Sequence, residues 1–123
     1  GARQDVVDAS GRTVASLPAV LEHQGYRYRF LAMQAGPAGR TPLPHLATPA
    51  GVPFLVTAGS TGSDTSPDAG TTYVTGLAQE AGATSGGWQT IPQPARAAGT
   101  VGLRTEGKAP TGTAFVAVYV PEG

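Results

Sequence analysis

The clearest hydrophobic and polar pattern lies between Tyr26 and Met33, where aromatic and charged residues alternate. Tyr26, Tyr28 and Phe30 share one face of an extended chain, whereas Arg27 and Arg29 share the other. This alternation predicts a strand with one face on a core.

Other short apolar runs are separated by turn residues. Val6 to Val14 predicts an opening hairpin, because Asp8 and Gly11 occupy the first and fourth positions of a type I turn. A second hairpin is expected where Ala109-Pro110-Thr111-Gly112 joins two strands. The later predicted strands are Val52 to Ala58, Thr71 to Gln79, Trp88 to Ile91, Thr100 to Glu106 with Val101 and Leu103 inward, and Thr113 to Val120.

Two segments interrupt this series. Leu17 to Gln24 fits one or two helical turns after Pro18, or a strand that turns at Gln24-Gly25. Gln34 to Gly51 contains four prolines and is expected to be a long loop. Polar loops are expected at Gly59 to Gly70 and Glu80 to Gly87, and Pro92 should stop the Trp88 strand from continuing as a central strand.

The last strand is apolar on both faces. Phe115, Ala117 and Tyr119 lie on one face, and Ala114, Val116, Val118 and Val120 lie on the other. A strand of this kind is covered on both sides. In a sandwich the opposite sheet covers one side, so the second needs a loop, the Leu17 to Gln24 segment or a neighbouring subunit.

These elements predict an all-β fold, an antiparallel β-sandwich or jelly-roll-like domain with long Pro/Gly-rich loops and at most one short helix. We expect residues 1–123 to form a single domain. Val, Leu, Ile and Phe make up few of these residues, and Gly and Pro together supply 29 of 123. Few large apolar residues give a small hydrophobic core, which makes a solitary monomer only marginally stable and favours self-association.

Composition also restricts the partners. A net charge of zero with eight scattered basic residues predicts no nucleic acid partner, and the longest apolar run is far shorter than a membrane span. The chain contains no cysteine, so no disulfide or thiolate site is possible. Because it opens with Gly1 rather than Met, we expect a processed form or an excised domain.

No pattern of catalytic or metal-binding residues stands out, and we expect no enzyme, cofactor or metal site. His23 and His45 have no ligand spacing between them, and Asp64 and Asp68 match no calcium loop. The only lysine, Lys108, lies in no phosphate-binding motif. No serine has a nucleophile motif, and flexible loop composition explains Ser60, Ser63, Ser66 and Ser85.

The aromatic residues suggest a glycan platform, for which the candidate ligand-binding residues are Trp88, Tyr26, Tyr28 and Tyr73. Gly86 to Ile91 and Gly99 to Arg104 resemble the later strands of carbohydrate-binding jelly-roll modules, over about a quarter of the chain. A single Trp and the absence of Asn depart from that pattern. These departures favour the interpretation of Trp88 as a core or rim residue.

The leading hypothesis is a non-enzymatic structural domain of an extracellular assembly, in particular a phage virion component such as a capsid decoration, tail or fibre domain. Its partners would be copies of itself or other virion or surface proteins, and its candidate interface residues are Phe115, Val116, Val118 and Tyr119. One alternative is a carbohydrate-binding module that binds glycans. The other is a filament subunit in which Gly1 to Asp8 adds a strand to the next copy.

Overall fold

The computed structural model describes residues 3–40, 42–61, 71–77, 81–84, 88–106 and 112–122. These residues form strands and turns and contain no helix, which confirms the all-β prediction. Accordingly, this part of the chain offers no helix with the length and apolar character to cross a membrane. The strands are β1 (Arg3–Val7), β2 (Thr13–Pro18), β3 (Val20–His23), β4 (Tyr26–Pro37), β5 (His45–Ala47), β6 (Phe54–Ser60), β7 (Thr71–Thr75), β8 (Ala81–Thr84), β9 (Trp88–Gln93), β10 (Thr100–Glu106) and β11 (Thr113–Pro121).

Strands β4 to β11 pair in the order of a jelly roll. β4 pairs with β11, β5 with β10, β6 with β9 and β7 with β8, as in one long antiparallel hairpin. Pairing of β11 with β6 and of β10 with β7 closes this hairpin into two sheets. The sheet orders are β3-β4-β11-β6-β9 and β5-β10-β7-β8, which agrees with the jelly-roll-like fold expected from the sequence.

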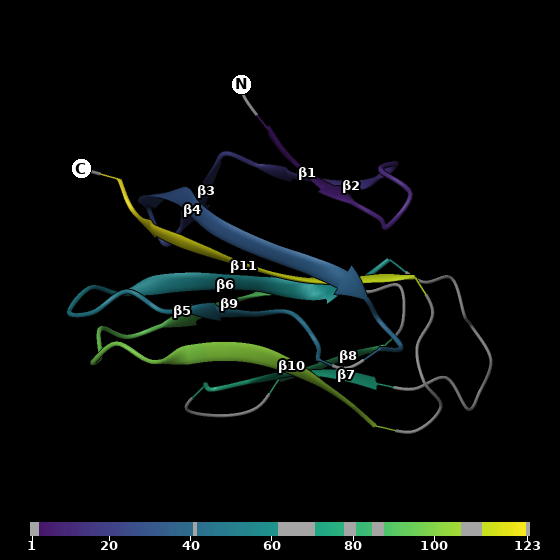
Figure 1. The fold of residues 1–123 in the computed structure, drawn as a ribbon. Coiled ribbons are helices and arrows are strands. Elements are labelled where there is room, and N and C mark those ends of the chain that lie inside the picture. Colours follow the sequence, from purple (N-terminus) through teal and green to yellow (C-terminus); the bar gives the residue numbers. More distant parts are fainter. Residues whose placement is uncertain are drawn as a thin grey trace.

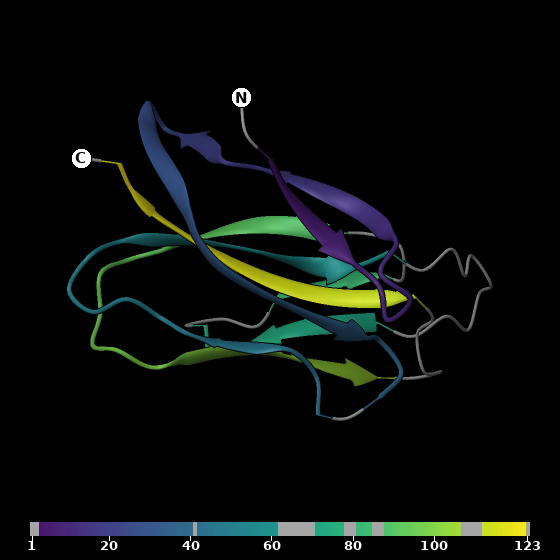
Figure 2. The same cartoon turned by 45° about the horizontal axis from the view of Figure 1, so that its top comes forward.

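The molecule has three layers, with the five-stranded sheet in the middle (Figure 1). The four-stranded sheet lies on one side, and the hairpin of β1 and β2 lies on the other. Figure 2 shows the turn of this hairpin close to the start of β11. The core between the two sheets is built from alternate residues of facing strands, among them Phe54, Val56, Val116, Val101 and Leu103.

The second core explains the doubly apolar strand β11. Phe115, Ala117 and Tyr119 have no exposed surface because the opening hairpin covers them with Val6 and Leu17. The predicted burial of both faces is therefore confirmed. Leu17 contributes to this cover from the segment between residue 17 and residue 24, and Val6, Val14 and Ala15 supply the rest from β1 and β2, whereas Leu21 belongs to the covered sheet through β3.

The opening hairpin forms as predicted. The N–H of Gly11 donates to the carbonyl of Asp8 at 3.0 Å, which closes the turn. The Asp8 carboxylate accepts bonds from the Ser10 hydroxyl at 2.6 Å and from the backbone N–H groups of Ser10 and Arg12. The Ser10 hydroxyl bond is the largest of the interactions that lower the pKa of Asp8. This polar residue therefore organises the turn.

The alternation in β4 is confirmed for its inner residues and then reverses. Tyr28 and Phe30 belong to the second core, whereas Tyr26 is exposed at the start of the strand. The β11 register passes from Phe30 to Ala32, which leaves Leu31 in a bulge and half exposed. Because an extra residue exchanges the two faces, Met33 continues the row that Phe30 begins.

The expected hairpin between the last two strands is wrong. β10 pairs with β5 and β7 in one sheet, whereas β11 pairs with β4 and β6 in the other. The two strands therefore belong to different sheets. The reason lies in β11 itself, because a strand apolar on both faces is buried best in the middle layer.

For residues 17–24 the strand alternative is confirmed and the helix alternative is wrong, since β3 is followed by the predicted turn at Gln24-Gly25. Two expected loops contain strands: the one from residue 34 to residue 51 holds the end of β4 and the short β5, and the one from 80 to 87 holds β8. β9 continues past the predicted end at Ile91 to Gln93, but it is an edge strand and not a central one, as Pro92 indicated.

Candidate functional site

The four aromatic residues predicted to bind a glycan do not form one platform. Trp88 is level with Ala35 across the five-stranded sheet, since Trp88 pairs with Gly59, Gly59 with Phe115 and Phe115 with Ala35. Tyr28 lies seven residues away along β4, which is more than about 20 Å in an extended strand. Trp88 and the tyrosines of β4 therefore cannot contact one small sugar.

Tyr73 lies on the opposite side of the molecule. Its neighbour Val74 points into the core between the sheets, so Tyr73 points outward from the four-stranded sheet. The guanidinium carbon of Arg104 lies 4.2 Å from the centre of the Tyr73 ring, and Arg104 also forms an ion pair with Glu106 at 3.0 Å. One face of this ring is thus occupied by a cation–π contact and is not free to stack on a sugar.

Trp88 is half exposed, with 50 % of its surface accessible. Its ring packs on Phe115 with 5.6 Å between ring centres and an interplanar angle of 66°. This edge-on contact fixes the indole on the rim of the second core. Trp88 is therefore a rim residue, in agreement with one interpretation of its sequence context.

The predicted interface residues are internal. Phe115 and Tyr119 lie beneath the opening hairpin, whereas Val116 and Val118 lie between the two sheets, and none has accessible surface. In the closed single chain these residues therefore offer no free surface to a neighbouring subunit, because the chain covers both faces of β11 with its own residues.

The structure does bring Tyr26 and Tyr28 together, in a pocket at one end of the sandwich. The pocket has a volume of about 390 Å³ and is lined by Tyr26, Arg27, Tyr28, Pro53, Pro121 and Glu122, which we call the end groove. Tyr26 is 71 % exposed. Tyr28, Pro53 and Pro121 give the groove apolar walls. At its rim, Arg27 Nε lies 3.4 Å from Glu122 Oε2, so the two opposite charges form an ion pair with no net charge.

Sequence reasoning missed the two prolines of this groove. Pro121 pairs with Tyr28 across β11 and β4, and Pro53 immediately precedes β6. The two prolines are 68 positions apart in the sequence. Only the strand order places them side by side, so no local pattern signals the groove.

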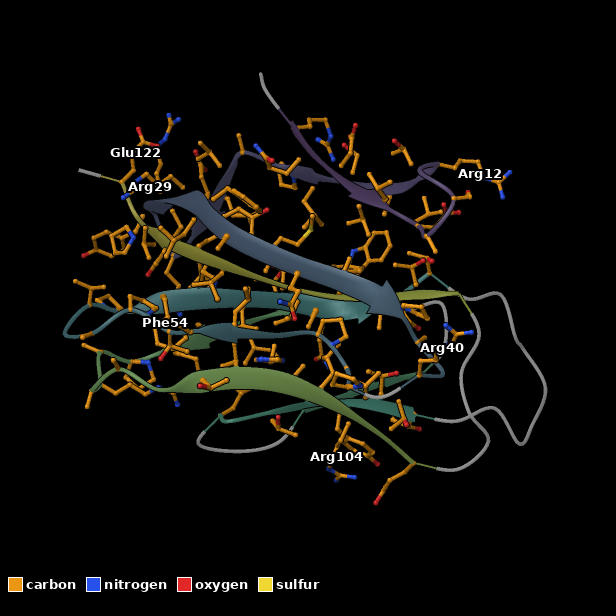
Figure 3. The ribbon with its side chains drawn as sticks, viewed as in Figure 1. Arg12, Arg29, Arg40, Phe54, Arg104 and Glu122 are labelled. Atoms are coloured by element: carbon orange, nitrogen blue, oxygen red, sulfur yellow. The ribbon has the colours of Figure 1, made fainter. Side chains whose placement is uncertain are left out.

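A second hollow, of about 490 Å³, lies between the tip of the opening hairpin and the end of the five-stranded sheet. Ser10 and Arg12 line it from the hairpin, and Pro37 and Thr61 line it from the sheet. Figure 3 shows Arg12 at the opposite end of the molecule from Arg29 and Glu122. The hairpin tip and the end groove are therefore separate surfaces.

Tyr119 links the hairpin to the sheet. Its hydroxyl donates a hydrogen bond of 2.7 Å to the carbonyl of Pro18, and its ring meets Phe30 edge-on at 5.7 Å. Burial raises the pKa of Tyr119 to about 12, and the charge of Arg3 opposes this only in part. The phenol is neutral at pH 7 and serves as a hydrogen-bond donor.

The residues considered for chemistry remain dispersed. His23 lies in β3 and His45 in β5, on different sheets. Among the described residues, no three His, Cys, Asp or Glu side chains group around a possible metal position. Ser60, expected in a flexible loop, instead ends β6 and is fully buried. The other candidates lie outside the described residues: Ser63, Asp64, Ser66, Asp68, Ser85 and Lys108.

Comparisons with protein families, with characterised proteins and with solved structures found no match for this chain. Its function is therefore inferred from its own surfaces, above all from the end groove.

Proposed function

We propose that this chain is a non-enzymatic structural domain of an extracellular assembly, such as a capsid decoration, tail or fibre domain of a virion, and that it acts through contacts between protein subunits. The observation that carries the proposal is the end groove, where Tyr26 stands exposed beside Tyr28, Pro53 and Pro121. Exposed aromatic side chains at concave apolar surfaces are typical of protein–protein contacts.

The fold supports the proposal by analogy. Jelly rolls are the fold of many viral capsid domains and also of lectins. Because one fold serves many functions, the jelly-roll fold supports the proposal less strongly than the exposed end groove does. The small charged fraction of the chain, 13 %, agrees with subunits that pack closely.

Self-association of the whole chain provides the test. We expect the weight-average mass, measured by sedimentation equilibrium, to rise between about 1 μM and about 1 mM. Tyr26→Ser should weaken the association about tenfold, because it removes an aromatic anchor. Leu31→Ser is the matched control, since Leu31 is an exposed apolar residue on the same strand, away from the groove. A monomeric wild type throughout this range, or equal effects of the two substitutions, would count against the proposal.

Glycan binding is the second candidate, favoured by the half-exposed and firmly packed Trp88. A glycan array probed with the wild type and with Trp88→Ala separates the two functions. Binding that Trp88→Ala abolishes supports a carbohydrate-binding module. No binding, together with self-association that depends on Tyr26, supports the structural domain.

A further inference from the structure

In the described part of the chain, the opening hairpin is a separate layer with no strand pairing to the sheet beneath it. β1 pairs with β2, and neither belongs to the five-stranded sheet. The backbone hydrogen bonds of the hairpin turn, from Asp8 to Arg12, also stay within the hairpin. A two-stranded hairpin is at best marginally stable in water. Docking on the sheet therefore stabilises this one.

Side chains provide that docking. Val6 and Leu17 are buried against Leu55, Phe115 and Tyr119, and the Tyr119 hydroxyl bonds to the Pro18 carbonyl. These contacts are the same whichever copy of the chain supplies the hairpin. The sheet also requires a cover, because an uncovered Phe115 and Tyr119 would expose a large apolar area.

The connection between the hairpin and the sheet is a single residue. β2 ends at Pro18, β3 begins at Val20, and Ala19 lies between them. The Ala19 carbonyl already accepts a 2.8 Å hydrogen bond from the N–H of Phe30, so the sheet begins at this residue. A short connection favours exchange of an element between copies, because straightening it separates the element without disturbing its neighbours.

We propose that the β1–β2 hairpin is an exchangeable arm, and that in the assembly it docks on the five-stranded sheet of a second copy of this chain. The arm of one copy then buries Phe115 and Tyr119 of the other. This inference rests on the proposed function only in that copies of the chain meet. It adds a contact that is independent of the end groove.

Cross-linking between copies tests the exchange. Ser10 and Pro37 are exposed residues that line the same hollow, one from the hairpin and one from the sheet. The chain has no cysteine, so Ser10→Cys and Pro37→Cys each introduce a unique thiol. The two variants, with different tags, are unfolded and refolded together and treated with a short bis-maleimide. We expect a mixed covalent dimer.

The matched control pairs Ser10→Cys with Arg29→Cys, because Arg29 is exposed at the other end of the molecule (Figure 3). We expect about tenfold more mixed product from Ser10 with Pro37 than from this control pair. Equal yields from the two pairs would overturn the exchange.

The hinge provides a second test. Insertion of Gly-Ser-Gly-Ser between Pro18 and Ala19 lengthens the hinge and favours closure of the arm on its own sheet over exchange, so the mixed product should fall about tenfold. The same insertion between Ser10 and Gly11 should leave the yield unchanged. Association that depends on Tyr26 but gives no mixed product refutes the exchange and leaves the proposed function standing. A chain that shows neither refutes both.

Discussion

Tyr119→Phe tests how the opening hairpin is held, because it removes one hydroxyl and no apolar volume. The variant loses the 2.7 Å hydrogen bond to the Pro18 carbonyl and leaves the aromatic contact with Phe30 in place. Pro18 is half buried, so water replaces the lost donor in part. We expect the free energy of unfolding at pH 7 to fall by about 1 kcal/mol.

The same substitution has the opposite effect at high pH. Burial raises the pKa of Tyr119 to about 12, above its ordinary value of 10.0, so the folded protein holds the phenol proton more tightly than the unfolded chain. The corresponding stability is complete below pH 10 and is lost as the pH rises toward 12. One pKa unit corresponds to about 1.4 kcal/mol, so the total loss approaches about 3 kcal/mol.

The two effects predict that the stability curves cross. The wild type should be more stable than Tyr119→Phe by about 1 kcal/mol at pH 7, equal to it at about pH 11, and less stable by about 1 kcal/mol at about pH 12. Urea unfolding followed by tryptophan fluorescence measures both proteins. Tyr26→Phe controls for alkaline effects, since Tyr26 is mostly exposed. A wild-type advantage that stays constant from pH 9 to 12 would refute the reasoning.

Three further predictions compare matched sites. In thermal unfolding, Gly76→Ala should lower the free energy of unfolding by several kcal/mol, whereas Gly25→Ala should lower it by about 1 kcal/mol. Both glycines have φ near +84°, but only at Gly76 does the new Cβ clash with the Thr100 carbonyl of β10. Gln24→Gly should raise the melting temperature, because Gln24 holds φ at +51°; an unchanged temperature would contradict the left-handed turn. In urea, Val6→Ala should cost about 2 kcal/mol and Val7→Ala less than about 0.5, since Val6 is buried and Val7 is 43 % exposed; equal losses would contradict the docking of the hairpin.

Local patterns predicted the strands better than their pairing. The alternation that begins at Tyr26 and the Asp8 turn depend on neighbours in the sequence, and both appear in the structure. The pairing of β11 with β4 and β6 depends on residues far away along the chain. Proximity in sequence suggested β10 as its partner. The jelly roll instead places the first and last strands of the wrapped hairpin together.

The candidate surfaces were less predictable than the fold, for the same reason. Tyr26 and Tyr28 were identified from their own strand, and the structure keeps them together. Trp88 and Tyr73 were grouped with them by residue type alone, and the strand order separates them onto an edge and onto the opposite sheet. The end groove also needs Pro53 and Pro121, which only the paired strands bring together.

The doubly apolar strand β11 shows how a requirement for burial can be read from the sequence while the element that meets it cannot. Its sequence required a cover on both faces, and either the chain itself or a neighbouring subunit satisfies that requirement. The structure closes the second face with the opening hairpin, an element that shares no strand pairing with the sheet and is joined to it through Ala19. A cover attached in this way forms the same contacts with Phe115 and Tyr119 within one copy or between two. Exchange of the arm between copies would therefore require no additional apolar surface, because it reuses the burial that already stabilises the single chain.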